Sequence, residues 1–465
     1  MPETHDVVIV GAGPTGIFTA YEIKQRCPDA DVIMLDLGPD LEDRRCPAWV
    51  TGKCTLCSVC SVMSGFGGAG AFSDGKINIS DKVGGSLYEF IPESSLLEII
   101  SYVDRLYVKM GAPKKLWGTN VDKISELKRK AYKHGFLLIP YKVRHMGLSG
   151  SRKVLSNFKR VLKSLGVEML FGKRVEHIIT KDSRVEGVQI QGDEVIKSKF
   201  VVAAPGRVGA DWLVKEAKRL SLGVEGGRID LGVRVEVPAE TMREFTDVLY
   251  EPKLVYYSKT FDDKVRMFCV NPGGEVITES YWGIVTVNGL SKGDELTENT
   301  NFALLVSTKF TEPFENTISY ALDIARLANN IAGNQPLIQR LGDLVRGRRS
   351  TPNRIKRSIV KPTLEGAVPG DLSFVLPYRY LTDIIETLKA LNELMPGIYS
   401  GHTLLYGVEI KLHTAKLELS SNLESAKIKG LYAGGDAAGV SRGLLQASAS
   451  GVIIGRDIAS KLMLS

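Results

Sequence analysis

The sequence has no apolar run near the roughly 18 residues that a membrane-spanning helix requires. It also lacks the cysteine density of a secreted disulfide scaffold, with six cysteines in 465 residues. A strand-like run from Asp6 to Val10 begins too early to leave room for a signal peptide. We therefore expect a cytoplasmic protein without a transmembrane segment.

Neither the composition nor the charge is extreme. Hydrophobic residues make up 44% of the chain and charged residues 24%, which is typical of globular proteins and excludes disordered and collagen-like chains. The length predicts two or three domains. The net charge of +7, from 60 basic and 53 acidic residues, is too mild for a dedicated nucleic-acid binder, so no stable nucleic-acid partner is expected.

The first forty residues follow the pattern of a dinucleotide-binding unit. The β-branched run passes into Gly11-Ala-Gly13-Pro14-Thr15-Gly16 and then into a helix-compatible segment. Gly11 permits a tight turn, Gly13 lets the backbone approach a pyrophosphate, and Gly16 lets the helix pack closely on the strand. Pro14 and Thr15 would open that helix, whose N-terminus favours an anion.

A second apolar run, Val32 to Leu35, ends in Asp36. The Asp36 carboxylate can accept hydrogen bonds from both ribose hydroxyls of an adenosine, and it would repel a 2′-phosphate. The alternative is a glycine turn in an unrelated α/β protein.

The other end of the chain carries a second glycine-rich turn. Residues 430–439 read GLYAGGDAAG, an apolar strand ending in Gly-Gly-Asp, and a helix-like segment follows. This pattern resembles the second FAD motif of glutathione-reductase-like flavoproteins. The resemblance implies that Asp436, after Gly435, binds the ribityl chain, and that Gly443 and Leu444 present backbone N–H groups near the flavin O2. The alternative is that Asp436 only caps the helix.

The strand between these two turns, Val201 to Ala204, closes on Pro205-Gly206 and is expected to return to the same sheet. In the flavoproteins that the chain resembles, the backbone around Val175 would contact the adenine. Three separated stretches therefore predict one Rossmann-like α/β sheet.

Residues 65–76 read GFGGAGAFSDGK and formally satisfy G-x-G-x-x-G. No credible strand precedes them and a Ser-Asp-Gly turn follows, so we reject a second dinucleotide turn. We expect this loop to pack its backbone against the flavin ring. The candidate contacts are Gly67, Gly68, Ala69, Gly70 and Ser73.

With GAGPTG, GFGGAGAFSDGK, APGRVGADWL, MFCVNPGG and GLYAGGDAAG in this order, the chain resembles a largely uncharacterised family of bacterial and archaeal FAD-dependent dehydrogenases. The resemblance covers nearly the whole chain, and GGAGAFSDGK is its specific block. It implies an FAD-dependent oxidoreductase in which two electrons and a proton pass between a small-molecule substrate and flavin N5. A soluble electron carrier or NAD(P)H would serve the other half-reaction.

Four cysteines stand within fifteen residues, at Cys46, Cys54, Cys57 and Cys60. The overlapping C-x₂-C-x₂-C spacing with a remote fourth cysteine beside proline is typical of iron–sulfur ligation, and a [4Fe-4S] cluster is the first hypothesis. Zinc is an alternative, and metal-free thiols are another.

The middle of the chain predicts a second, substrate-binding unit. We expect FAD-binding segments at residues 1–87 (with the cysteine-rich loop), 141–224 and 401–465, a helical insertion at 88–140, and an α+β substrate domain at 225–400.

Few residues suggest catalysis. Glu409 and Lys411 alternate onto one strand face and would supply an acid and a cation near the flavin, although a surface ion pair is equally consistent. Cys269, in MFCVNPGG, would approach the pocket or simply pack in the core.

Residues 340–361 hold eight basic residues and one acid. This segment would attract an anionic substrate, an acidic electron carrier, anionic lipid or RNA, or would form a solvated face. A non-catalytic flavin sensor or RNA-associated protein is therefore the alternative function.

Overall fold

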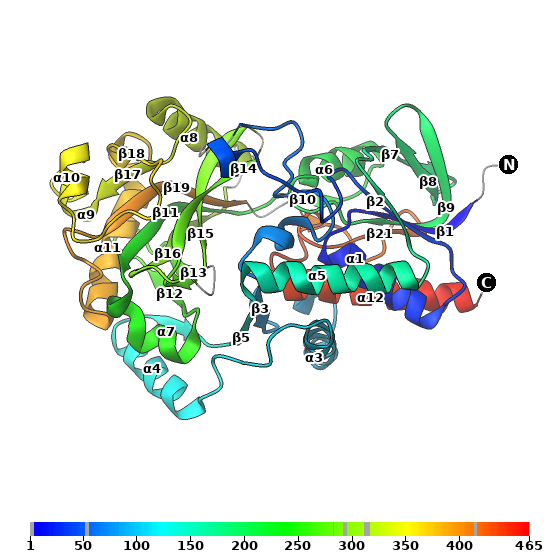
Figure 1. The fold of residues 1–465 in the computed structure, drawn as a ribbon, viewed down its shortest axis with the longest axis horizontal. Coiled ribbons are helices and arrows are strands. Elements are labelled where there is room, and N and C mark those ends of the chain that lie inside the picture. The colour runs from blue at the N-terminus through cyan, green and yellow to red at the C-terminus, as the bar shows by residue number, and fades with distance from the viewer. Residues whose placement is uncertain are drawn as a thin grey trace.

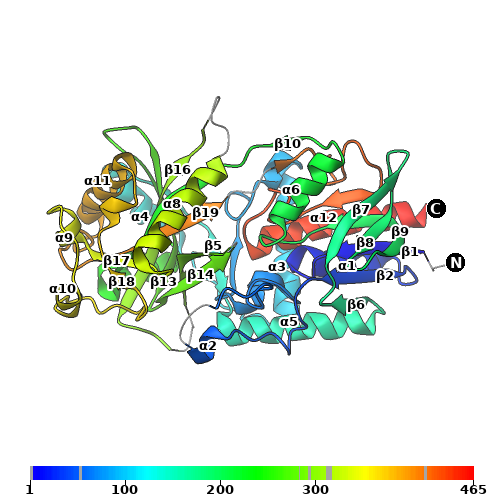
Figure 2. The same cartoon turned by 90° about the horizontal axis from the view of Figure 1, so that it is seen from above.

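The computed structural model describes residues 4–51, 55–281, 283–291, 295–310, 317–412 and 416–464. Its strands form two large sheets, one in each lobe, and both views show the lobes side by side (Figure 1, Figure 2). The start of β1 and the end of α12 lie at the same end of the molecule in both views.

The first sheet is the predicted Rossmann-like sheet. Its parallel strands have the order β6-β2-β1-β9-β21, which is 3-2-1-4-5 in chain order and matches doubly wound nucleotide-binding folds. The strands are β1 (His5–Val10), β2 (Val32–Asp36), β6 (Glu168–Phe171), β9 (Glu194–Ala203) and β21 (Leu431–Ala433). The prediction that three distant stretches build one sheet is confirmed.

Helices pack against one face of this sheet, and antiparallel strands pack against the other. Alternation along β1 sends Val7 and Ile9 to one hydrophobic cluster, with the helices, and Val8 and Val10 to another, with the antiparallel strands β7 and β8. The helices are α1 (Pro14–Arg26), α3 (Glu93–Lys109), α5 (Gly147–Ser164) and α12 (Leu444–Met463), and the strands are β7 (Val175–Lys181) and β8 (Arg184–Ile190).

The second sheet has the order β18-β17-β19-β11-β16-β13-β12-β4. Along β11, side chains from Ile229 to Val237 point alternately to the two faces of the sheet. Every second one is apolar and is buried against helices α4, α7, α8 and α11. The polar residues between them face the other way. The strands are β4 (Leu137–Ile139), β11 (Ile229–Pro238), β12 (Lys253–Tyr257), β13 (Lys264–Pro272), β16 (Asn299–Thr308), β17 (Leu337–Arg340), β18 (Val368–Pro369) and β19 (Leu404–Leu412), and the helices are α4 (Val121–Lys133), α7 (Arg243–Leu249), α8 (Thr317–Ala332) and α11 (Tyr378–Leu394).

The helix-like segments of residues 88–140 form α3 and α4 as expected, but they serve different lobes. Helix α3 packs in the hydrophobic cluster of the first sheet, whereas α4 packs in that of the second. Strand β4, which the sequence did not predict, extends the second sheet by pairing with β12. The expected strands and helices of residues 225–400 are present, including a hairpin of β14 (Glu275–Tyr281) and β15 (Ile284–Leu290).

The remaining elements are short. They are α2 (Ala48–Thr51), β3 (Lys76–Ile79), β5 (Lys142–His145), α6 (Ala210–Arg219), β10 (Val224–Glu225), α9 (Leu341–Leu344), α10 (Pro352–Lys356) and β20 (Lys416–Leu417). No helix in the described part of the chain combines the length and apolarity needed to cross a membrane.

Candidate functional site

The turn between β1 and α1 has the geometry that its glycines predict. Gly11 has φ +107°, and a Cβ there would lie 2.1 Å from the Ala204 carbonyl oxygen. A Cβ on Gly16 would lie 2.1 Å from the Gly11 carbonyl oxygen, so the start of α1 packs directly on the turn. Pro14 is the first residue of α1, and no side chain caps its N-terminus. The free N–H groups there are available to an anion.

Gly13 differs from Gly11 and Gly16, the other two glycines of this turn. Its backbone is ordinary extended chain, with φ −78°, and a Cβ built on it meets no atom within 4 Å. Neither strain nor packing within the chain therefore requires glycine at this position. Gly13 lines a cleft, so a side chain there would fill space that a bound pyrophosphate needs. The residues of the turn thus fit a dinucleotide.

Asp36 lies at the end of β2, beside this turn. Its carboxylate accepts hydrogen bonds from the backbone N–H groups of Ala12, Gly38 and Gly65, each at 2.8 Å. Burial raises the pKa of Asp36 above its ordinary value, although the three amides oppose that shift. A carboxylate has about four acceptor positions. Asp36 therefore holds two loops together and keeps little capacity for a ribose.

The second glycine turn reaches the same place from the far end of the chain. Strands β1 and β21 pair with opposite sides of β9, and Val10 and Ala433 are both in register with Ala203. Helices α1 and α12 pack side by side, and Thr15 Oγ1 donates to the Ala447 carbonyl at 2.9 Å. The turns after β1 and β21 consequently open at one edge of the sheet.

Asp436 follows β21 and faces the cleft. It accepts hydrogen bonds from Arg207 Nε at 2.9 Å and from Ser441 Oγ at 3.0 Å. Gly443 is the N-cap of α12 and offers no side chain to the free N–H groups of that helix. The contact between Asp436 and Arg207 was not predicted, because Arg207 stands 229 residues away in the sequence.

The glycine loop of residues 65–76 lies between the two turns. Gly67 has φ +86° and donates its N–H to the Ala12 carbonyl at 2.7 Å. A Cβ on Gly68 would lie 3.3 Å from the Gly13 Cα, and one on Gly70 would lie 2.7 Å from Leu444 Cδ2. Residues 68–72 form a single 3₁₀ turn. The described residues directly before this turn, 55–67, form no strand, and the turn opens no α-helix, which agrees with the expectation that it is not a second dinucleotide turn.

A cleft of about 2020 Å³ connects these parts. Three of the predicted cofactor or catalytic residues, Gly16, Gly67 and Glu409, do not line this cleft. The predicted residues that line the cleft are Gly11, Gly13, Pro14, Thr15, Asp36, Gly68, Ala69, Gly70, Ser73, Val175, Pro205, Gly206, Lys411, Gly435, Asp436, Gly443 and Leu444.

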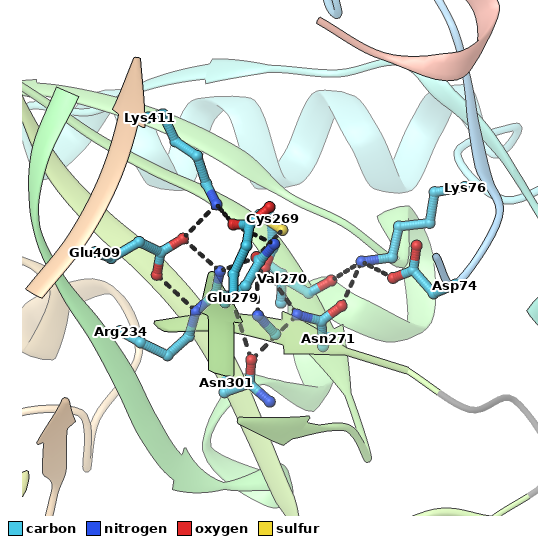
Figure 3. A network of polar contacts seen from close by, with 12 residues as sticks. Asp74, Lys76, Arg234, Cys269, Val270, Asn271, Glu279, Asn301, Glu409 and Lys411 are labelled. Carbon is cyan, nitrogen blue, oxygen red and sulfur yellow. Dashed lines mark hydrogen bonds and ion pairs between the residues drawn. The ribbon is translucent and has the colours of Figure 1, made fainter. Parts of the chain in front are cut away.

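The opposite wall of the cleft is the polar face of the second sheet. Here Arg234 and Glu409, both fully buried, form a two-pronged ion pair with N–O distances of 2.8 and 2.7 Å (Figure 3). Burial alone would lower the pKa of Arg234, but Glu409 raises it above the ordinary value. Because Glu409 is held in this ion pair, it is poorly placed to transfer a proton.

Lys411 lies at the edge of this network and lines the cleft. Its Nζ is 3.2 Å from Glu409 Oε1 and 3.5 Å from Glu279 Oε2. Burial alone would raise the pKa of Glu279, but Lys411 and Arg207 lower it below its ordinary value. Arg207 is 3.4 Å from Glu279 as well as in contact with Asp436, so it connects the two lobes across the cleft.

Cys269 also lines the cleft. The sequence had allowed either a position near the pocket or one in the core. It has φ +52°, an unusual value for a residue other than glycine, at an irregularity in the pairing of β13 with β16. Its carbonyl accepts from Arg234 at 2.8 Å. Nearby, Lys76 Nζ donates to the Val270 carbonyl at 2.7 Å and pairs with Asp74 at 3.0 Å. Sequence reasoning missed Lys76 and Arg234. The only signal for Arg234 was its place among the charged residues that alternate with apolar ones on β11.

The predicted metal ligands are placed in part. Cys46 and Cys60 line the cleft, Cys57 is exposed, and Cys54 lies outside the described residues. No group of three potential ligands converges among the residues that the structure describes. The basic segment 340–361 does not line the cleft. Its one acid, Asp343, accepts hydrogen bonds from Arg348 Nε and Ser350 Oγ, each at 2.8 Å.

Comparisons with known proteins bear on the class of the protein. Residues 228–412 match the family model of the FAD-dependent protein C-terminal domain, and residues 367–464 match that of glucose inhibited division protein A. A Clostridium beijerinckii protein, described as uncharacterized, is 26% identical over 475 residues, covering 98% of this chain and 80% of that protein. The family matches bear out the predicted class, an FAD-dependent oxidoreductase.

Solved structures resemble the chain only weakly. Glycine oxidase from Bacillus cereus has 14% identity and a TM-score of 0.40, covering 98% of this chain and 96% of that one. L-proline dehydrogenase from P. horikoshii has 12% identity and a TM-score of 0.44, with coverages of 99% and 95%. Neither similarity bears on the substrate.

Proposed function

We propose that the chain binds one FAD along the cleft and uses it to oxidise or reduce a small molecule held against the second sheet. The convergence of the β1 and β21 turns on one cleft is the observation that carries this proposal. The adenine would lie by Val175, the pyrophosphate at the start of α1, and the flavin ring between the glycine loop and Gly443. The finer resemblance to the dehydrogenase family with the GGAGAFSDGK block stays a prediction.

The residues of the chain have positioning roles in this proposal. The free N–H groups of α1 and the bare backbone of Gly13 bind the pyrophosphate. Asp436, oriented by Arg207 and Ser441, binds the ribityl hydroxyls. When bound, FAD supplies the two-electron chemistry, and the protein supplies orientation and charge.

On the substrate side, Lys411 is the residue that we assign to contact with the reacting molecule. Its side chain lines the cleft, and its buried Nζ lies within ion-pair distance of Glu409 and Glu279. Glu409 lies behind it and is bound to Arg234, so we assign Glu409 to the positioning of Lys411 rather than to acid catalysis.

The variant Gly13→Val tests the cofactor site. It fills space that the chain leaves open, so the protein should fold with unchanged stability but lose bound FAD, measured by the flavin released on denaturation. Gly366→Val is the matched control, because Gly366 is exposed and lies outside the cleft lining. Wild-type flavin should bleach under a reductant and recover on reoxidation. Wild-type protein without FAD, or a Gly13→Val protein that retains it, contradicts the proposal.

We further propose that the cysteine segment holds an iron–sulfur centre that exchanges electrons between the flavin and a soluble carrier. The support is that Cys46 and Cys60 line the same cleft as the glycine turns. Iron and zinc analysis of anaerobically purified protein tests this point separately. Iron with sulfide and a brown colour are expected, and metal-free yellow protein would exclude the centre while leaving the FAD proposal intact.

A further inference from the structure

The strongest feature that FAD leaves unexplained is a group of cations on the polar face of the second sheet. On β13, Lys264 and Arg266 stand two residues apart and so share one face. Arg266 is in register with Val255 of β12, which places Lys253, two residues earlier, on the same face. Arg228 precedes β11 on this side of the sheet. All four line the cleft.

A fifth cation comes from the opposite wall. Arg442 immediately precedes Gly443, the N-cap of α12, and its N–H donates to the Gly84 carbonyl at 2.8 Å. Arg442 also lines the cleft. It interacts electrostatically with Arg266, Arg228 and Lys253, so the two walls bring positive charge to one place. That place adjoins the end of the cleft where we put the flavin ring.

The carboxylates of this region neutralise the group only in part, and Glu251 attracts Lys253 while Asp436 and Glu89 attract Arg442 without forming ion pairs with them. Asp230 is bound to Arg266 and accepts from Ser307 Oγ at 2.5 Å, and Glu251 is 3.8 Å from Lys76. Throughout the described chain, no ion pair involves the other four cations, which are Arg228, Lys253, Lys264 and Arg442.

Arg266 itself is incompletely satisfied. Its side chain is 16% exposed, and its Nε is buried without a hydrogen-bond partner among the described residues. Burial, together with Arg442 and Arg228, lowers the pKa of Arg266 to about 10. A buried donor that lacks an acceptor is costly.

The pyrophosphate of FAD does not account for these charges. In the proposed site it lies at the start of α1, where backbone N–H groups bind it, whereas four of the five cations stand on the second sheet. A solvated face does not account for Arg266, which is largely buried, and although Arg228, Lys264 and Arg442 are exposed, all five cations line the same cleft.

We propose that this group, the cationic end of the cleft, binds the substrate as a small organic anion with at least two negative charges, carried by carboxylate or phosphate groups. The inference rests on the proposed function, since it takes the flavin ring to lie beside Gly443. Charge-assisted hydrogen bonds from arginine suit both kinds of anion.

The test uses the holoprotein with citrate and inorganic pyrophosphate as anionic probes and glycerol as a neutral probe. Binding is measured by calorimetry and by the change in the flavin absorbance. The variant Lys264→Gln/Arg442→Gln removes two cations from the cationic end. Lys128→Gln/Arg129→Gln removes two exposed cations from α4, outside the cleft, and is the matched control.

We expect one or both anions to bind, to be weakened by salt, and to bind at least about tenfold more weakly to the cleft variant with unchanged FAD content. If only one of the two anions binds, the result tells carboxylate from phosphate. Equal binding by variant and control, binding by neither anion, or loss of FAD from the cleft variant would overturn the inference. Protein without FAD refutes the proposed function instead, and the calorimetric arm still decides whether the anion site exists.

Discussion

At the residue scale, the features that matter most are charged groups buried in pairs. Arg234 and Glu409 stand 175 residues apart, and each is fully buried. The sequence pattern predicted that Glu409 and Lys411 share a strand face, but it carried no sign of the arginine opposite. Local patterns show which face a side chain takes, whereas partners on distant strands follow only from the sheet order.

Glu409→Gln keeps the shape of the side chain and removes its charge. The Arg234 guanidinium would then be buried without the carboxylate that binds it, so the free energy of unfolding should fall by about 3–5 kcal/mol in urea titrations. Asp323→Asn breaks an exposed pair with Arg326 and should change stability by less than about 1 kcal/mol. If the two substitutions lowered the free energy of unfolding equally, the buried pair would stabilise the protein no more than the exposed one.

Asp383 gives the protein a pH-dependent stability. It is fully buried, and burial together with nearby Asp263 raises its pKa from the ordinary 3.8 to about 6. The folded state thus keeps a proton that the unfolded chain has released. The stabilisation is complete below about pH 4 and is lost as the pH rises through 6.

Asp383→Asn cannot ionise, so it should gain stability relative to wild type, on the order of 2 kcal/mol, between about pH 4 and pH 7.5. Urea titrations at both pH values measure this gain. A difference between variant and wild type that does not change with pH would refute the shift.

At the element scale, the close packing of α1 against α12 holds the two glycine turns together. A Cβ on Gly451 of α12 would lie 2.3 Å from the Thr15 carbonyl oxygen and 3.0 Å from the Thr19 nitrogen. The helices themselves were predictable from their composition and from the glycine turns that begin them. The register between them was not, because it depends on this steric fit between opposite ends of the chain.

Gly451→Ala should destabilise the protein by about 1–3 kcal/mol, although alanine is the better helix former, because α1 must move to accept the methyl group. Gly150→Ala in α5 is the matched control, since the nearest atom to its Cβ is 3.4 Å away. There the same change should stabilise by up to about 1 kcal/mol. Thermal unfolding of both variants distinguishes them, and stabilisation by Gly451→Ala would contradict the fit.

At the scale of the whole molecule, a cleft between two hydrophobic cores brings distant stretches of the chain together. The sequence predicted strands β1, β9 and β21 of the nucleotide-binding lobe and the turns that follow them, since each of these turns carries a local glycine signature. It did not predict that β4 would join the second sheet or that Arg207 would connect Asp436 with Glu279 across the cleft. These contacts depend on how the two lobes meet, which no local pattern records.

The most direct measurement is a crystal structure of the protein grown with FAD. We predict the adenine at Val175, the pyrophosphate beside Gly13 at the start of α1, and the flavin ring between Gly70 and Gly443, facing Lys411. An FAD bound in the reverse direction, an FAD bound outside this cleft, or a cleft that stays empty at saturating FAD would contradict the account.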